Sequence, residues 1–244
     1  MDLSHNTVLV TGGGSGIGLA LAKAFAKNGN TVLVCGRDTK KLEAVSNETS
    51  NIAGFPCDIA HDGNQQELLE HIKRAYPDFN ILINNAGIQN TYKFSETKDH
   101  THLIEEEVNI NLLGQLKLTD RLLPLLMARP SAAIINITSA LALVPKQSAP
   151  VYCATKAAMH VFTKSLRYQL EGSSVKVFEI IPALVDTAMT TGRGRGKISP
   201  EALASEALRG IESNTYEIRI GKTKILLALN RLLPSAAEKV LKNG

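Results

Sequence analysis

The feature that most constrains the fold is a β-branched run that leads directly into a glycine turn and then into a helix. Thr7–Val10 predicts a strand, followed by TGGGSGIG and by the helical pattern LALAKAFAKNG. Gly12, Gly16 and Gly18 allow the backbone to turn tightly and to approach a pyrophosphate. A helix that begins near Ile17 offers unpaired N–H groups and the positive end of its dipole. The pattern predicts a dinucleotide-binding loop; the alternative is a glycine-rich turn that binds nothing.

Strand and helix patterns then alternate along the chain, which favours a parallel sheet. The further strand patterns are TVLVCGR after the helix stop at Asn28-Gly29, NIAGFPCDIA ending at Asp58, NILINNAG, IINITS, VKVFEIIPALVDT and YEIRIG. A length of 244 residues suits one large domain. We expect a single doubly wound (Rossmann) α/β domain, with a parallel sheet of about seven strands flanked by helices and a leucine-rich C-terminal helical tail.

The end of the second strand should face the adenosine ribose of a bound dinucleotide. A site for NAD usually places an acidic residue there to hydrogen-bond the ribose 2′-hydroxyl. Here Gly36 is followed by Arg37, whose planar fork can pair with a 2′-phosphate. This favours NADP(H) over NAD(H). Against it, Asp38 follows directly, and a surface arginine after a strand is unremarkable by itself.

The turns after the third and fourth predicted strands carry further candidate cofactor contacts. Asp58 either meets the adenine edge or caps the helix that follows it. The small residues of Asn84–Gly87 keep bulk away from a position where a cofactor ribose could lie. A plain turn would use the same residues.

The chemistry is predicted to lie in the stretch TSALALVPKQSAPVYCATK, residues 138–156. Tyr152 and Lys156 are four residues apart, so on a helix both side chains lie on one face. A free tyrosine has a pKa of about 10. A nearby lysine cation favours the phenolate and makes the phenol a better general acid/base. Ser139, at the end of a buried strand, could present its hydroxyl to the same point, although most Tyr-x-x-x-Lys pairs are ordinary neighbours on a helix.

A long helical pattern over residues 105–127 is apolar around more than one face. Its leucines stand at 112, 113, 116, 118, 122, 123, 125 and 126. We expect the sheet to bury one side and a partner subunit to bury another. Asn111 is a poor residue for a helix interior and is therefore a candidate for a functional polar contact.

Together, TGGGSGIG (11–18), NNAG (84–87), Asn111 in NINLLG, Ser139 and YCATK (152–156) resemble the short-chain dehydrogenase/reductase family. The motifs occur in that family's order and spacing from residue 7 to about 222. Within the family, the chain's ending and its VYCATKAA segment look like bacterial oxidoreductases associated with D-alanylation of teichoic acid. The resemblance implies hydride transfer between NADP(H) and a small carbonyl or alcohol substrate.

The resemblance also implies roles for individual residues. Tyr152 would be the general acid, Ser139 would orient the carbonyl oxygen, and Lys156 would act on the tyrosine and hold the nicotinamide ribose. Asn111 would anchor a water that connects Lys156 to solvent. The implied cofactor-binding residues are Gly12, Gly14, Ser15, Gly16, Ile17, Gly18, Arg37, Asp58, Ile59, Asn85, Ala86, Gly87, Tyr152, Lys156, Pro182, Val185 and Thr187. Similar enzymes usually have Pro-Gly where this chain has Pro182-Ala183, which puts the local turn in doubt.

Two segments after the sixth predicted strand are basic. In TTGRGRGKISP, a predicted lid, Arg193, Arg195 and Lys197 either attract an anionic substrate or belong to a solvated loop. Members of the family commonly end soon after the last strand, so we divide the chain into a catalytic domain, 1–222, and a helical extension, 223–244. Residues 222–244 hold five basic residues and one acidic residue, which equals the formal net charge of +4 for the whole chain. This apolar, basic tail could pack on the domain or a partner subunit, or contact a membrane surface.

Composition excludes other classes of function. The body of the chain is electrically balanced, which argues against nucleic-acid binding. The three cysteines are widely spaced and fit neither a disulfide framework nor a zinc site, and His100 and His102 have no further ligand at metal spacing. We expect no metal, no signal peptide, a cytoplasmic location and a homodimer or homotetramer that uses the helices at 105–127 and 152–170. The alternatives to an enzyme are an NADP(H)-binding regulator on the same fold and a scaffold at a membrane surface.

Overall fold

The strands are built from apolar, largely β-branched runs that are buried on both faces of a sheet. The computed structural model describes residues 1–192 and 194–242. In strand β5 all six residues are buried, and β1 buries four of its five, as expected for a parallel sheet covered on both sides. The strands are β1 (Thr7–Thr11), β2 (Thr31–Gly36), β3 (Ile52–Pro56), β4 (Phe79–Asn84), β5 (Ala132–Ile137), β6 (Val175–Pro182) and β7 (Glu217–Ile220).

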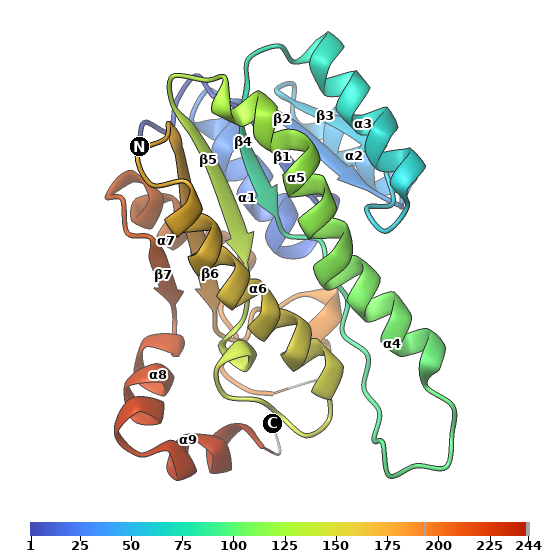
Figure 1. The fold of residues 1–244 in the computed structure, drawn as a ribbon, viewed down its shortest axis with the longest axis vertical. Coiled ribbons are helices and arrows are strands. Elements are labelled where there is room, and N and C mark those ends of the chain that lie inside the picture. The colour runs from blue at the N-terminus through green and yellow to red at the C-terminus, as the bar shows by residue number, and fades with distance from the viewer. Residues whose placement is uncertain (193, 243–244) are drawn as a thin grey trace.

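Within the described ranges these seven strands form one sheet in the order β3-β2-β1-β4-β5-β6-β7, and every pair is parallel. The predicted α/β class and strand number are confirmed. Strand β1 lies between β2 and β4, so the chain winds outward in opposite directions from this point (Figure 1). In such sheets ligands bind at the carboxyl ends of the strands beside this switch point. Here those ends are Thr11 and Asn84.

Alternating residues of each strand pack against different helices. Val8 and Val10 point into a core with α1, α2 and α7, whereas Leu9 points into a second core with α3, α5 and α6. The helices are α1 (Gly16–Lys27), α2 (Thr39–Glu48), α3 (Asp62–Ala75), α4 (Thr101–Val108), α5 (Gly114–Met127), α6 (Pro150–Gln169), α7 (Pro200–Glu212), α8 (Thr223–Leu232) and α9 (Pro234–Leu241). Short single turns lie at Ala140–Ala142 and Ala188–Thr190.

Two predicted boundaries are wrong. The third strand ends at Pro56 and not at Asp58. The Cys57 N–H still donates to the Gly36 carbonyl, and the chain turns away from the sheet at the next residue. The helix predicted at 105–127 begins at Thr101, and α4 continues into α5 through a π-helical turn at Asn109–Leu113. Such turns occur frequently at functional sites.

The leucine-rich pattern of that helix has the predicted two-sided character. Leu118, Leu122 and Leu126 are fully buried against the sheet, whereas Leu113 and Met127 are exposed. Leu123 and Leu125 are half-buried and pack against the same core, so the second apolar side is uncovered only in part in the single chain.

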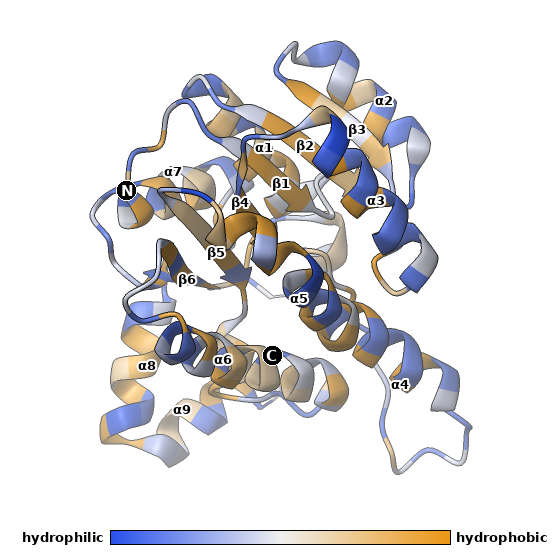
Figure 2. Cartoon of the chain, turned by 45° about the horizontal axis from the view of Figure 1, so that its top comes forward, coloured by the Kyte–Doolittle hydropathy of each residue, from blue (hydrophilic) through white to orange (hydrophobic). Residues whose placement is uncertain are grey.

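The tail folds as two helices that meet at Pro234, where the sequence predicted a break (Figure 1). It returns to the body of the domain, since the Gln147 N–H donates to the Lys242 carbonyl. Figure 2 shows orange apolar segments along both helices. Ile225 and Leu232 on α8 and Val240 on α9 are among the exposed side chains, as is Leu233 between the two helices. No helix in the part of the chain that the structure describes has the length and apolarity needed to cross a membrane.

Candidate active site

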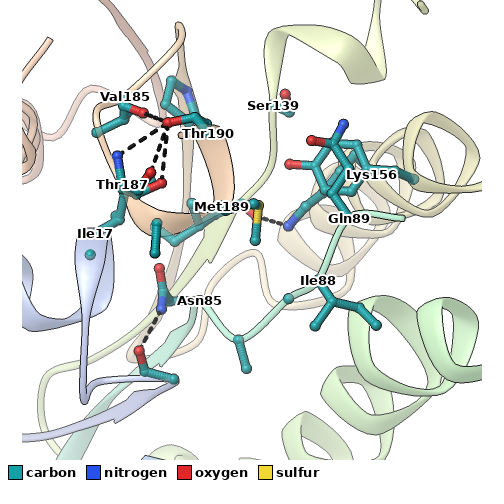
Figure 3. A pocket seen from close by; sticks show the side chains of 18 of the residues that line it. Ile17, Asn85, Ile88, Gln89, Ser139, Lys156, Val185, Thr187, Met189 and Thr190 are labelled. Carbon is teal, nitrogen blue, oxygen red and sulfur yellow. Dashed lines mark hydrogen bonds between the residues drawn. The ribbon is translucent and has the colours of Figure 1, made fainter. Parts of the chain in front are cut away.

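A cavity of about 730 Å³ opens along the carboxyl ends of the strands, within the size range of small-molecule and cofactor sites. Its wall includes Ile17 from the glycine loop, Ser139 and Lys156 (Figure 3). Of the predicted site residues, all except Gly18 and Asn111 line this cavity. These two lie directly behind its wall.

The glycine loop has the shape that a diphosphate requires. Gly12 has a φ of 64° and Gly16 a φ of 54°, both in the left-handed region that favours glycine. A Cβ at Gly18 would collide with the Gly12 carbonyl oxygen and the Asn85 amide, so this position must lack a side chain for α1 to pack so closely. Ser15, at the N-cap position, makes no side-chain cap bond, which leaves the first N–H groups of α1 open to the cavity. The loop therefore fits the pyrophosphate of a dinucleotide.

The predicted ribose end of the cavity is lined by Arg37 and Asp38. The Asp38 carboxylate caps α2 by accepting the Lys41 N–H at 3.2 Å, and hydrogen bonds from Lys41 hold the pKa of Asp38 below its ordinary value. Arg37 lies 3.5 Å from Glu106, and both side chains are about half exposed. Exposed pairs of this kind contribute little free energy, so Arg37 can turn to another anion.

Asp58 lies half-buried in the turn between β3 and α3. Its carboxylate accepts the Ala60 N–H at 3.0 Å, and its own N–H donates to Asn64 at 3.2 Å. The alternative role as a helix cap is wrong, because α3 begins at Asp62 and His61 takes the cap position. Ile59 is buried beside it on the cavity wall.

Hydrogen bonds tie the turn after β4 to the glycine loop. The Thr11 hydroxyl oxygen accepts the N–H groups of Asn85 and Ala86 at 2.9 and 3.0 Å, and the Asn85 amide donates to the Thr11 carbonyl at 2.9 Å. A Cβ at Gly87 would lie 3.3 Å from the Asn111 side-chain oxygen and 3.7 Å from the Lys156 ammonium. The small residues of this turn therefore keep open the space between these two polar groups.

Asn111 occupies the π-helical turn and is completely buried. Its side-chain oxygen accepts the Ile88 N–H at 2.8 Å, and its amide donates to the Ile88 carbonyl at 2.8 Å and to the Thr155 hydroxyl at 3.3 Å. These hydrogen bonds link the loop after β4 to the helix that carries Lys156. The extra residue of the π turn is what directs Asn111 inward while Leu118 and Leu122 still face the sheet.

Tyr152 and Lys156 both lie on α6, with the ammonium 5.8 Å from the centre of the phenol ring. Lys156 donates to the Ile137 carbonyl at 2.8 Å, and its burial lowers its pKa to about 8 because burial disfavours the charged form. Ser139 follows β5, and its hydroxyl oxygen accepts the Leu141 N–H at 3.1 Å. That bond leaves the hydroxyl proton available to a second acceptor in the cavity.

Sequence reasoning missed a buried polar cluster behind these groups. Glu179 is completely buried in β6; it accepts the Thr138 hydroxyl proton at 2.6 Å and lies 2.8 Å from the His160 ring nitrogen. His160 is one turn after Lys156 on α6, and Thr138 precedes Ser139. The cluster therefore joins β5, β6 and α6 beneath the site. The available signal was a glutamate inside the otherwise apolar strand VKVFEIIP.

The segment after β6 separates the basic residues that the sequence grouped together. Lys197 is not available to a substrate, because its ammonium binds the Asp186 carboxylate at 3.1 Å and the Thr190 carbonyl at 2.7 Å. Arg195 lines the cavity, and Arg193 lies outside the described residues. Ala183 has a negative φ, so the alanine in place of the usual glycine causes no strain in the turn.

Across residues 1–192 and 194–242, no three histidine, cysteine or acidic side chains are grouped so that they could hold a metal ion. The His100 ring stacks on Tyr92, with centroids 4.7 Å apart, and makes no side-chain cap bond to α4, so the solvated or capping role that we expected for this histidine from the sequence is wrong. All three cysteines are buried with free thiols, as packing residues would be.

A doubly wound sheet with a glycine loop at its switch point defines a nucleotide-binding α/β fold, and the comparisons identify which one. The family model described as short chain dehydrogenase matches residues 6–197, and the chain belongs to this family of oxidoreductases. The family acts on small-molecule substrates and commonly oligomerises.

Among particular proteins, the chain is 39% identical over 225 residues to the uncharacterized oxidoreductase DltE of Bacillus subtilis, covering 89% of each chain. An uncharacterized oxidoreductase of Staphylococcus aureus strain USA300 is 31% identical over 211 residues, which cover 84% of this chain and 90% of the relative.

Solved structures agree on the fold. A short chain dehydrogenase/reductase from Burkholderia phymatum in complex with NAD superposes with a TM-score of 0.88 at 20% identity, covering 100% of this chain and 97% of that one. A short chain dehydrogenase from Burkholderia cenocepacia in complex with NADP gives 0.87 at 24% identity, covering 100% of both chains. Fold neighbours thus include proteins crystallised with either dinucleotide.

Proposed function

We propose that this protein transfers hydride between NADP(H) and a carbonyl or alcohol substrate, with Tyr152 as the general acid/base. One observation carries the proposal. Ser139, Tyr152 and Lys156 come from two separate segments and line the same cavity as the glycine loop. A protein that only binds a nucleotide has no need of proton-transfer groups beside it.

In the direction of reduction, Tyr152 donates its phenolic proton to the carbonyl oxygen of the substrate. The ammonium of Lys156 favours the phenolate that remains. The Ser139 hydroxyl donates a hydrogen bond to the same oxygen and stabilises the charge that develops on it. When bound, the nicotinamide cofactor supplies the hydride.

Proton supply to Tyr152 is proposed to run through Lys156 and the space beside Gly87. A Cβ placed there would contact both Asn111 and Lys156, so the glycine leaves room between them. Asn111 holds this space open by fixing Ile88 on one side and Thr155 on the other. We propose that a water held near Asn111 connects Lys156 to solvent.

The cofactor is proposed to be NADP(H). Arg37 lines the cavity and has only a long, exposed pair with Glu106, while Asp38 is engaged as the α2 cap. A guanidinium is thus available for a 2′-phosphate at this end of the cavity. Asn85, Ala86, Val185 and Thr187 would contact the rest of the dinucleotide.

The test is NADPH oxidation across a panel of carbonyl compounds by wild type and Tyr152→Phe. We expect turnover to fall at least about 100-fold, because positioned general acids contribute about 10²- to 10⁴-fold, while NADPH binding stays unchanged. Tyr168→Phe is the matched control, since Tyr168 lies on the same helix but is 67% exposed. Equal turnover by wild type and Tyr152→Phe contradicts the role of Tyr152.

A non-enzymatic regulator predicts a different result in the same experiment. Wild type would then bind NADPH in a calorimetric titration, but none of the carbonyl compounds in the panel would cause NADPH oxidation. Binding without turnover would therefore move the assignment to the regulator.

We further propose that the protein is a cytoplasmic homo-oligomer that assembles through the helices at 105–127 and 152–170. Leu113 and Met127 on the first helix and Val161 and Tyr168 on the second are exposed in the single chain. Exposed apolar rows on two neighbouring helices are typical of subunit interfaces. Light scattering after size-exclusion chromatography tests the assembly, and a monomeric wild type would refute it.

A further inference from the structure

Part of the cavity wall comes from the segment that follows the last strand. Lys222 lies between β7 and α8, and Thr223 and Leu226 lie on α8 itself; all three line the cavity. Val240 and Leu241 reach the cavity from α9. The extension therefore contributes to the site that the glycine loop begins.

Charge is distributed unequally along this cavity. Among its described lining residues the carboxylates are Asp38 and Asp58, which follow β2 and β3. Arg195 and Lys222 lie at the other end, next to β6 and β7. Arg37 and Lys41 line the cavity beside Asp38 and balance these two carboxylates. Because β3 and β7 are the two edges of the sheet, the excess of positive charge lies at the end away from the predicted adenosine site.

Lys222 lies against the loop that carries Arg195. A Cβ on Gly196 would be 2.8 Å from the Lys222 ammonium, so this ammonium rests against the backbone residue next to Arg195. Neither cation has a carboxylate within ion-pair distance in the described part of the chain. Their sequence neighbours differ: Lys197 is paired with Asp186 and Lys224 with Glu206.

The N-terminus of α8 adds further hydrogen-bond donors at the same place. Lys222 occupies the cap position without a side-chain cap bond, and the first turn of this ten-residue helix holds no acidic residue. Thr223 is 1% exposed, and its hydroxyl has no hydrogen-bond partner among the residues described. An uncapped helix start presents free N–H groups and a positive dipole end, which favour an anion.

We propose that Arg195, Lys222 and the helix start at Thr223 form a subsite for an anionic group on the substrate. Apolar side chains from the neighbouring segments also line the cavity, namely Leu141, Leu184, Met189, Leu226, Val240 and Leu241. The substrate class is thus an amphiphilic carbonyl compound that carries a carboxylate or a phosphate. This inference rests on the proposed function for the reaction, and it adds the class of substrate that the site selects.

The first experiment compares oxoalkanoates of graded chain length with their methyl esters and with oxoalkyl phosphates of equal length. We expect wild type to have a higher kcat/KM for an anion than for its ester, and the carboxylate and phosphate arms identify the preferred anion. Arg195→Ala and Lys222→Ala should each lower kcat/KM for the anion about 10- to 100-fold. Each variant loses a charge-assisted hydrogen bond to the anion, and such bonds are stronger than those between neutral groups. Their values for the ester should not change.

Two variants separate the subsite from a general effect of charge. Lys224→Ala removes the same charge two residues further on, where the lysine is paired with Glu206 at 2.8 Å, and should leave the anion preference intact. Thr223→Val keeps the side-chain shape and removes the hydroxyl, and it should weaken anion selection without affecting the ester. A variant effect that is equal for acid and ester overturns the subsite, as does equal use of both by wild type.

A binding measurement keeps the inference testable if no carbonyl is reduced. Calorimetry of the NADP⁺-loaded protein with an unreactive alkanoate and its methyl ester should show tighter binding of the alkanoate, lost in Lys222→Ala. If instead the variants weaken NADPH binding, the two cations serve the cofactor and the subsite is refuted. Absence of turnover together with selective alkanoate binding would refute the proposed reaction and leave the subsite standing.

Discussion

The burial of Lys156 makes the stability of the protein depend on pH in a predictable direction. The side chain is 3% exposed, and burial lowers its pKa from 10.5 to about 8. Between these two values the unfolded chain binds more protons at this residue than the folded protein does. Stability therefore rises as pH rises from about 8 to about 10.5, because the folded state is relieved of a buried charge.

The magnitude follows from the size of the shift. One pKa unit corresponds to about 1.4 kcal/mol, so the full effect of this lysine is about 3 kcal/mol. Between pH 7.5 and 9.5 the free energy of unfolding should gain about 2 kcal/mol from Lys156 alone. Other groups titrate in the same range, so a reference that lacks only this titration is required.

Lys156→Met supplies that reference, since methionine has a similar unbranched chain and no charge. Urea unfolding of both proteins without cofactor, at several values between pH 7.5 and 9.5, gives the difference in unfolding free energy at each pH. We expect wild type to gain about 2 kcal/mol relative to the variant across this range. A difference that stays constant with pH would show that the ammonium is solvated and would refute the reasoning.

Further variants test other parts of the site. Gly18→Ala should abolish NADPH binding or unfold the loop, because the new methyl group collides with the Gly12 carbonyl oxygen. Dinucleotide titration together with circular dichroism distinguishes the two outcomes. Normal NADPH binding by the variant would contradict the close packing at Gly18. Arg37→Ala should raise the KM for NADPH about tenfold and leave that for NADH unchanged, as expected for loss of one charge-assisted contact; tighter NADH binding by wild type would refute the cofactor assignment. For the tail, we expect equal and negligible sedimentation of wild type and Leu232→Ser with anionic liposomes, because its exposed apolar side chains are expected to pack against a partner subunit. Selective binding of wild type would favour membrane contact.

Much of the cofactor end could be predicted because its signals are local. The glycine loop sits between a strand and a helix that are continuous in sequence, so its position at the switch point follows from the pattern around Gly12–Gly18. Tyr152 and Lys156 needed only helical spacing to be placed on one face. Parallel strand order then brings Ser139, at the end of β5, to the same edge of the sheet.

Other features depend on tertiary contacts that no short pattern contains. The π-helical turn exists because Asn111 must reach Ile88 while the following helix still buries its leucines. Lys222 and Thr223 reach the cavity because the chain turns back after β7. The partner of Glu179 could not be identified from sequence, since His160 lies on a different element and 19 residues away.

The π-helical turn also sets the rotational phase between α4 and α5. Each residue advances a helix by about 100°, so deleting one residue within 109–113 would keep a continuous helix but rotate everything before it by that angle. Glu107, whose carboxylate now accepts the Asn90 N–H at 2.8 Å, would swing away from the loop that it anchors. The one additional residue of the π turn thus fixes the orientation of α4, and with it the Glu107 contact to the loop after β4, relative to the face of α5 that packs on the sheet.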